Sequence, residues 1–169
     1  VILAIILSII ILVVSQVLSF AISELPLSIG MPSAICNILA GILYIIFAFA
    51  GAKLLCQKVL KISLSELRIP RLTIKPVWLI SAIAMPALVL VLAILIGGHW
   101  EFNAFNVADR NATITGAIFF YGLATGIVEE LIFRGIIMGC LEKRFNIHIA
   151  IIVPSVLFGL LHIIGNDLN

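Results

Sequence analysis

The stretch ITGAIFFYGLATGIVEELIFRG, residues Ile114 to Gly135, decides how this chain must fold. It is long enough to cross a lipid bilayer, which takes about 20 residues in a helix. Yet it contains two acids and a base, Glu129, Glu130 and Arg134. A charged group at the centre of a bilayer costs from about 2.5 to more than 10 kcal/mol. The stretch therefore predicts a membrane-spanning helix whose charged groups have partners and a function.

The composition of the whole chain also indicates a membrane protein. Of the 169 residues, 63% are hydrophobic and 11% are charged, whereas a soluble domain is about half apolar and roughly a quarter charged. Lipid offers the backbone no water, so all secondary structure should be helical. No basic helix interleaved with aromatic residues is present, and nucleic acid is not an expected partner. Cys36, Cys56 and Cys140 are too scattered for a metal knuckle or a redox pair.

Apolar stretches along the chain predict an all-α fold, a multi-span transmembrane helix bundle with about five spans. The predicted spans are residues 1–23, 34–55, 77–96, 114–142 and 147–164, with polar loops at 23–33 and 97–113. We expect residues 1–169 to form a single membrane-embedded helical domain. Because the chain opens at Val1 and stops soon after an apolar helix, we also expect it to be a fragment at both ends.

Basic residues predict the orientation of the chain. The 53–75 connection holds six Lys and Arg residues and the 143–144 turn holds two, against one in 97–113 and none in 23–33. Short loops rich in Lys and Arg stay in the cytoplasm, and five alternating spans place both basic connections on the same side. We therefore expect an integral membrane protein with these two loops in the cytoplasm. The compact size suggests a bacterial plasma membrane.

The face of the fourth span that carries the charges has a regular pattern. Gly122, Gly126, Glu130 and Arg134 repeat every four residues. Glycines at this spacing allow another helix to approach closely. The charges are therefore predicted to lie on a packed, protein-facing side of the span.

One helix face of residues 154–165 in the fifth span carries a single ionisable group. In PSVLFGLLHIIG, residues 154–165, the side chains of Phe158 and His162 lie on the same face. If the turn between the two spans lies near Asn146, antiparallel packing brings His162 level with Glu130. The acid pair and the imidazole are therefore predicted to meet at one depth.

A carboxylate beside an imidazole inside a membrane suits more than one function. The pair can activate a water molecule for attack on a carbonyl group. It can relay protons in a small transporter, or it can be an ion-paired helical hairpin without a reaction. With one histidine and two glutamates available at this depth and no HExxH pattern, a closed zinc site is not favoured.

The sequence EELIFRG, followed by FGLLH on the next span, resembles the CAAX prenyl protease and bacteriocin-processing (CPBP) family, also called the Abi family. Its members are multi-span intramembrane proteases with three short motifs: EExxxR, FxxxH, and a later HxxxN or HxxxD. Glu129, Glu130 and Arg134 match the first motif, and Phe158 and His162 match the second. The resemblance covers a helical hairpin of about 114–165.

The resemblance implies roles for these residues. Glu129 would be the base that activates water, assisted by His162, while Glu130 and Arg134 would support it. Members have been described both as metalloproteases and as metal-independent glutamate proteases. The residues favour a reaction without a cofactor; in the zinc-dependent alternative, Glu129 and His162 would be ligands. No histidine follows His162, so we expect activity only if residues beyond Asn169 supply the third motif.

The resemblance also implies partners, namely the lipid bilayer and a peptide or prenylated protein. The expected reaction is hydrolysis of a peptide bond in a membrane-associated, prenylated CAAX-like or bacteriocin-leader substrate. The alternative is a non-catalytic membrane protein, in bacteriocin self-immunity or small-molecule transport, that uses the same ionisable groups.

Overall fold

The computed structural model describes residues 1–63, 76–97 and 106–166. Within these ranges all regular secondary structure is helical, which confirms the predicted all-α class. The chain divides into a larger unit, Val1–Ile69 with Asn106–Asn169, and a smaller unit, Pro70–Phe105. That residues 1–169 form one membrane-embedded domain stays a prediction.

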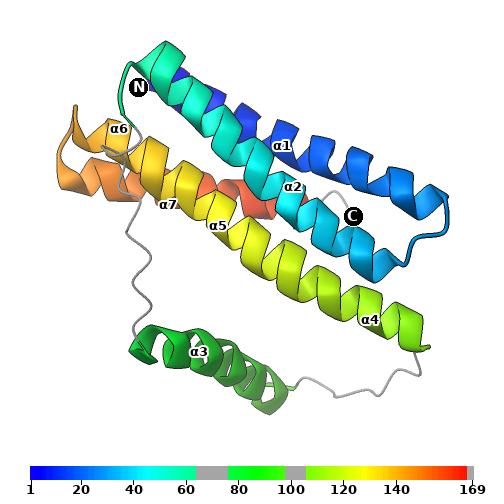
Figure 1. Ribbon diagram of the computed structural model, residues 1–169. Coiled ribbons are helices and arrows are strands. Elements are labelled where there is room, and N and C mark those ends of the chain that lie inside the picture. The colour runs from blue at the N-terminus through cyan, green and yellow to red at the C-terminus, as the bar shows by residue number, and fades with distance from the viewer. Residues whose placement is uncertain (64–75, 98–105, 167–169) are drawn as a thin grey trace. The chain divides into compact units, whose positions relative to one another are not determined.

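The larger unit is built from long helical segments, shown in Figure 1. α1 spans Ile2–Ser28, and α2 spans Ser33–Leu54 and continues as the π-helical η1, Leu55–Leu60. A continuous rod follows, made of α4 (Val107–Thr115), η3 (Gly116–Ala124), α5 (Thr125–Glu129), η4 (Glu130–Ile137) and α6 (Met138–Glu142). α7 spans Ile147–Asn166. The helix of the smaller unit is α3, Pro76–Leu95.

The helices have the length and composition that a membrane requires. Among the described residues, three stretches are long and apolar enough to span a bilayer, namely Ile2–Ser28, Ser33–Leu60 and Val107–Glu142. The apolar helix Ile147–Ile163 is shorter. α3 has 20 residues, and its sequence contains no charged residue.

The two ends of α2 have different neighbours, and the predicted number of five crossings stays a prediction. η1 ends beside α6, because Leu60 and Lys143 line one pocket. The rod begins at the opposite end of α2, where the Asn37 side chain donates a hydrogen bond to the Ala112 carbonyl at 2.7 Å. The end of η1 and the start of α4 therefore lie at opposite ends of the larger unit.

Two predicted loop boundaries are wrong. α1 continues through Pro26 to Ser28, so the predicted 23–33 loop is shorter. The rod begins at Val107, inside the predicted 97–113 loop, because the Asn106 side chain caps the helix and accepts a hydrogen bond from the Asp109 amide at 2.9 Å. The other loop residues with ionisable side chains, His99 and Glu101, lie outside the described ranges, as do residues 64–75 of the basic connection.

Small residues bring α1 and α2 together. The buried positions of α1 are Ala4, Ser8, Ser15, Ser19 and Ser23, and α2 buries Cys36, Ala40, Gly41, Tyr44, Ala48 and Ala52. Small side chains let helix backbones approach closely in a membrane protein. The fit is tight, because a Cβ atom on Gly51 would lie 2.8 Å from the Ile11 side chain.

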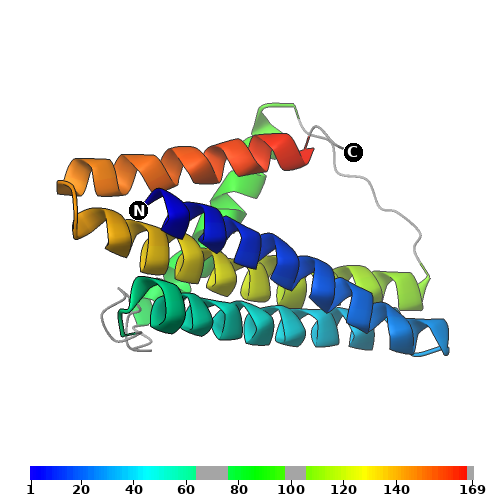
Figure 2. The same cartoon turned by 90° about the horizontal axis from the view of Figure 1, so that it is seen from above.

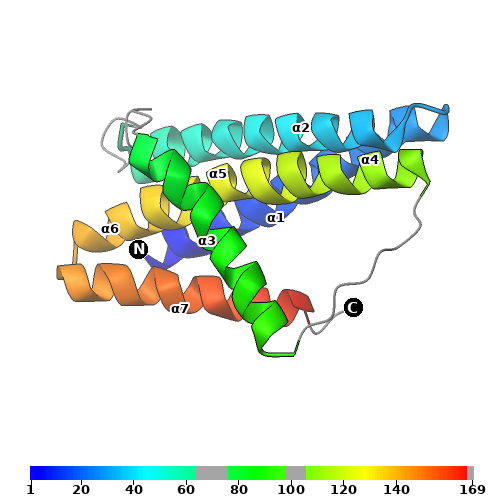
Figure 3. The same ribbon diagram turned by 90° about the horizontal axis from the view of Figure 1, so that it is seen from below.

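The rod is covered by different partners along its length. α2 packs against α4, η3 and α5, whereas α7 packs against η4 and α6 (Figures 2 and 3). Aromatic rings fill the first contact, where Phe120 lies 5.6 Å from the Tyr44 ring and 4.5 Å from the Phe20 ring. Glu129 and Glu130 stand at the junction of α5 and η4. The acid pair therefore lies where the main packing partner of the rod changes from α2 to α7.

Candidate active site

The hairpin between α6 and α7 has the predicted turn. α6 ends at Glu142 and α7 begins at Ile147. The Asn146 side chain accepts a hydrogen bond from the Ile149 amide at 3.0 Å, which satisfies one of the free amide groups at the start of α7. α7 then returns along η4, antiparallel to it.

This return brings the imidazole to the acid pair. His162 Nε2 lies 3.8 Å from Glu129 Oε1, so the predicted meeting of these groups is confirmed. The closest acid is Glu129 and not Glu130, a difference of one residue, or about 1.5 Å along the helix axis. The Glu129 side chain is 22% exposed, and that of His162 is 52% exposed.

Phe158 holds the imidazole through both its backbone and its ring. His162 Nδ1 lies 2.9 Å from the Phe158 carbonyl oxygen, and because that oxygen can only accept, Nδ1 carries the hydrogen. In the neutral imidazole, Nε2 then presents its lone pair toward Glu129. The Phe158 and His162 rings lie 4.2 Å apart, and the Phe133 ring meets Phe158 edge-on at 5.3 Å.

Glu130 and Arg134 form the predicted ion pair along one helix face. Arg134 Nη1 lies 3.2 Å from Glu130 Oε2. Both side chains are well exposed, at 71% for Arg134 and 59% for Glu130. The two adjacent acids therefore differ in their partners, because Glu129 faces His162 and Glu130 faces Arg134.

A known protein family resembles the segment that contains this hairpin. Residues 111–168 match a family model described as type II CAAX prenyl endopeptidase Rce1-like. Over these residues the chain is similar to the Rce1-like family. The match confirms the predicted resemblance to CAAX proteases and, with three apolar helices long enough to span a bilayer, supports an integral membrane protein. No curated protein and no solved structure matches the chain.

The buried face of the Rce1-like segment differs from the predicted one. Glu130 and Arg134 are exposed, and a Cβ atom on Gly126 would meet no other atom within 4 Å in the described structure. The rod instead buries a row of larger apolar residues, Phe120, Ala124, Val128 and Ile132. These side chains make more van der Waals contacts with neighbouring helices than glycines can, and such packing drives helix association in a membrane. The prediction that Glu130 and Arg134 lie on a packed, protein-facing side of the helix together with Gly126 is therefore wrong.

One residue near the site, outside the Rce1-like segment, was not predicted. Tyr44 of α2 is 1% exposed, and its phenol interacts electrostatically with the Glu129 carboxylate. A buried tyrosine usually finds a polar partner for its hydroxyl group. A lone tyrosine in an apolar span was the available signal, but the sequence alone does not tell which helix it faces.

The donor atoms near His162 do not fit the zinc site considered from the sequence. A catalytic zinc ion normally has about three protein ligands. In the described part of the chain, no group of three or more His, Cys, Asp or Glu side chains lies close enough to share a metal ion. The Rce1-like hairpin supplies Glu129 and His162, while the Glu130 carboxylate is engaged by Arg134.

Proposed function

We propose that this protein is an intramembrane endopeptidase in which Glu129 and His162 activate a water molecule. The observation that carries the proposal is the 3.8 Å approach of Glu129 Oε1 to His162 Nε2. The Rce1-like match of residues 111–168, which spans both residues, supports a peptidase.

The separation of the two atoms suits a shared water molecule. A distance of 3.8 Å is longer than a good direct hydrogen bond. With Nδ1 donating to the Phe158 carbonyl, a neutral His162 and an ionised Glu129 face each other as two acceptors. A water molecule beside them, about 2.8 Å from each atom, can donate one hydrogen to each. Its lone pairs then remain available to attack a carbonyl carbon.

The reaction follows from this arrangement. The water oxygen forms a bond to the peptide carbonyl carbon, and Glu129 takes a proton from the water. When the carbon–nitrogen bond breaks, Glu129 returns this proton to the departing nitrogen, which leaves a carboxylic acid and an amine. His162 holds the second hydrogen of the water and sets its direction. A base in this role typically contributes about 10²–10⁴-fold in rate.

The ion pair has a supporting role in this proposal. Arg134 binds the Glu130 carboxylate at 3.2 Å, so a second negative charge beside Glu129 is partly compensated. Like charges at neighbouring positions disfavour each other's ionised forms. The pair therefore helps Glu129 to act as a base without touching the substrate.

The substrate is proposed from the family description and the membrane location. The peptide would be prenylated and CAAX-like, or a bacteriocin leader, and would reach the site from the bilayer. The basic ends of the helices, including Lys143 and Arg144, would face the cytoplasm of a bacterial cell. The chemistry is assigned to the side chains alone, without a metal.

The test is cleavage of a prenylated or leader-bearing peptide by the full-length protein in liposomes. We expect Glu129→Gln to lower the rate at least about 100-fold, and His162→Ala to lower it as well. Glu24→Gln is the matched control, because Glu24 is an exposed acid of α1 and should retain full activity.

Two outcomes would overturn parts of the proposal. Full cleavage by Glu129→Gln would remove Glu129 as the base. Loss of activity with a chelator, restored by zinc, would overturn the metal-free reaction. If the wild type cleaves no peptide but still protects cells from a bacteriocin or transports a solute, the non-catalytic alternative holds.

A further inference from the structure

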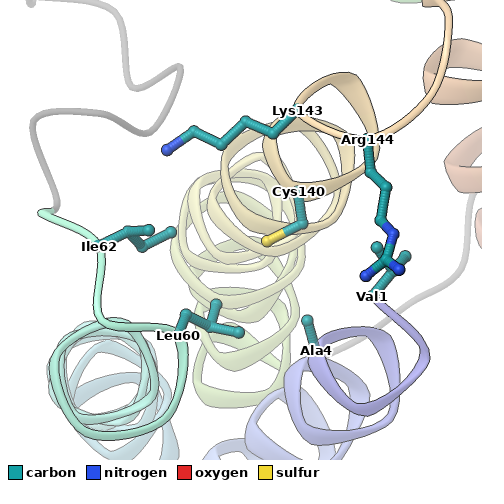
Figure 4. A pocket seen from close by; sticks show the side chains of 7 residues that line it. All are labelled: Val1, Ala4, Leu60, Ile62, Cys140, Lys143 and Arg144. Atoms are coloured by element: carbon teal, nitrogen blue, oxygen red, sulfur yellow. The ribbon is translucent and has the colours of Figure 1, made fainter.

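A pocket lies at the end of the larger unit where η1 and α6 end (Figure 4). Its volume is about 250 Å³. Apolar side chains from three segments form its walls, among them Ala4 of α1, Leu60 of η1 and Ile62. Lys143 and Arg144 also line it, directly after the end of α6. The pocket therefore combines an apolar interior with two cationic side chains.

The two cations lie on different sides of the pocket. Figure 4 shows Lys143 and Arg144 extending in different directions, with the Cys140 thiol pointing between Leu60 and Ala4. None of the described side chains that line the pocket is acidic. The carboxyl ends of η1 and α6 each contribute about half a negative charge, which is less than the two positive charges of the side chains. The side chains that line the pocket are therefore net cationic.

The two cations directly follow a long apolar stretch. Lys143 and Arg144 come immediately after Glu142, the last residue of the candidate span Val107–Glu142. Long basic side chains near the end of a membrane helix place their charges among headgroups while their carbon chains stay in apolar surroundings. Basic pockets between transmembrane helices are typical sites for anionic lipid headgroups.

We propose that this pocket binds the headgroup of an anionic phospholipid from the adjoining leaflet. Arg144 and Lys143 contact the phosphate, and Leu60, Ile62 and Ala4 contact the glycerol and the first carbons of the acyl chains. The volume is below the roughly 300–1,000 Å³ of pockets that enclose a drug-sized ligand. The pocket therefore takes the headgroup region only, and the acyl chains extend along the helices. The proposal is independent of peptidase activity.

Cys140 offers a direct probe of occupancy. It lines the pocket, whereas Cys36 and Cys56 are buried. The full-length protein is reconstituted in nanodiscs of phosphatidylcholine alone, or with phosphatidylglycerol, and the rate of Cys140 labelling by a thiol reagent is measured. We expect phosphatidylglycerol to slow labelling, and native mass spectrometry to show phosphatidylglycerol retained by the protein. Cys140→Ser identifies any labelling elsewhere.

Charge variants distinguish lipid binding at this pocket from a general attraction of the lipid to surface charges. Each cation near an anionic surface contributes a factor of about five in affinity, so Lys143→Gln with Arg144→Gln should weaken the preference for phosphatidylglycerol about 25-fold. The charge-preserving pair Lys143→Arg and Arg144→Lys should retain most of it. Arg110→Gln, at an exposed cation of α4, should leave it unchanged.

Three results would overturn the proposal. One is labelling of Cys140 that proceeds equally fast with and without phosphatidylglycerol. A second is an equal loss of lipid preference in Arg110→Gln, which would indicate diffuse attraction. The third is protection of Cys140 by inorganic phosphate in phosphatidylcholine nanodiscs as strong as that by phosphatidylglycerol, which would indicate a site for free anions.

Discussion

Both ring nitrogens of His162 have a polar neighbour: Nε2 lies 3.8 Å from Glu129 Oε1 on the neighbouring helix, and Nδ1 lies 2.9 Å from the carbonyl oxygen of Phe158. The first contact crosses the hairpin and the second stays within α7. The imidazole can therefore turn toward Glu129 only in the orientation that Phe158 allows. This relationship makes Phe158 a positioning residue in the proposed reaction.

Phe158→Leu tests this positioning role. The change keeps the carbonyl group but removes the ring contacts to His162 and Phe133, at 4.2 Å and 5.3 Å. Since a displacement of about 1 Å can cost up to about 100-fold in rate, we expect kcat to fall about 10- to 100-fold with KM little changed. Steady-state kinetics in liposomes measure both constants.

Phe158→Tyr is the conservative companion, because it keeps the ring and should keep most of kcat. Phe119→Leu, at a 40% exposed phenylalanine of η3, controls for the loss of a ring elsewhere. A rise in KM without a fall in kcat for Phe158→Leu would assign the residue to substrate binding.

The two adjacent glutamates should behave differently. Glu130 is ion-paired and 59% exposed, so Glu130→Gln should lower the cleavage rate less than about tenfold, far less than Glu129→Gln. Exposed pairs four residues apart on a helix contribute about 0.3–0.5 kcal/mol. A double-mutant cycle of Glu130→Gln and Arg134→Gln on unfolding in detergent should give a coupling energy of this size. Equal loss of activity in Glu129→Gln and Glu130→Gln would contradict the assignment of separate roles.

Two glycines test which face of the rod is packed. A Cβ atom on Gly41 of α2 would lie 3.0 Å from the Phe119 carbonyl oxygen and 3.4 Å from Ala124 Cβ. Gly41→Ala should therefore lower stability by about 1 kcal/mol or more, as overpacking does. Gly126→Ala meets open space and should leave stability equal or higher, since alanine is the better helix former. Thermal unfolding in the same detergent compares them, and the reverse order would mean that the glycine face is packed after all.

Asn37 should anchor the start of the rod. Its side chain donates to the Ala112 carbonyl at 2.7 Å, between segments far apart in the sequence. Asn37→Ala should cost about 1 kcal/mol, the usual net worth of a hydrogen bond. Hydrogen exchange should show faster opening of α4 than of α7. Ser28→Ala is a control, because the Ser28 hydroxyl donates its hydrogen bond within its own exposed turn. Loss of hydrogen-exchange protection in α7 of the Asn37→Ala variant would contradict a local role for Asn37.

Much of the fold was predictable because apolar length alone determines where a helix can span. The ends of the helices were harder to predict. Asn106 caps a helix inside a stretch that Asp109 and Arg110 had suggested to be a loop. A helix cap depends on the dihedral angles of one residue, and these cannot be predicted from the polarity of the surrounding sequence. α1 likewise continues past Glu24 through Pro26.

The site was predictable where it depends on helix geometry. The 1.5 Å rise per residue and a turn near Asn146 sufficed to bring His162 to Glu129. Which face of the rod packs was not predictable from four-residue spacing, because the row containing Val128 has the same spacing as the row containing Gly126. Tyr44 was missed because its nearness to Glu129 depends on how α2 packs, which the sequence of α2 does not encode.

The short α6–α7 turn has a consequence for biosynthesis. Glu129 and His162 belong to consecutive helices joined by residues 143–146, so they leave the ribosome close together in time. Insertion of the hairpin as one unit would let the acid enter the bilayer with its imidazole partner already beside it. Glu129 would then enter the bilayer protonated, with its hydrogen directed at the His162 Nε2 lone pair, which avoids the cost of about 2.5 kcal/mol or more for a lone buried charge.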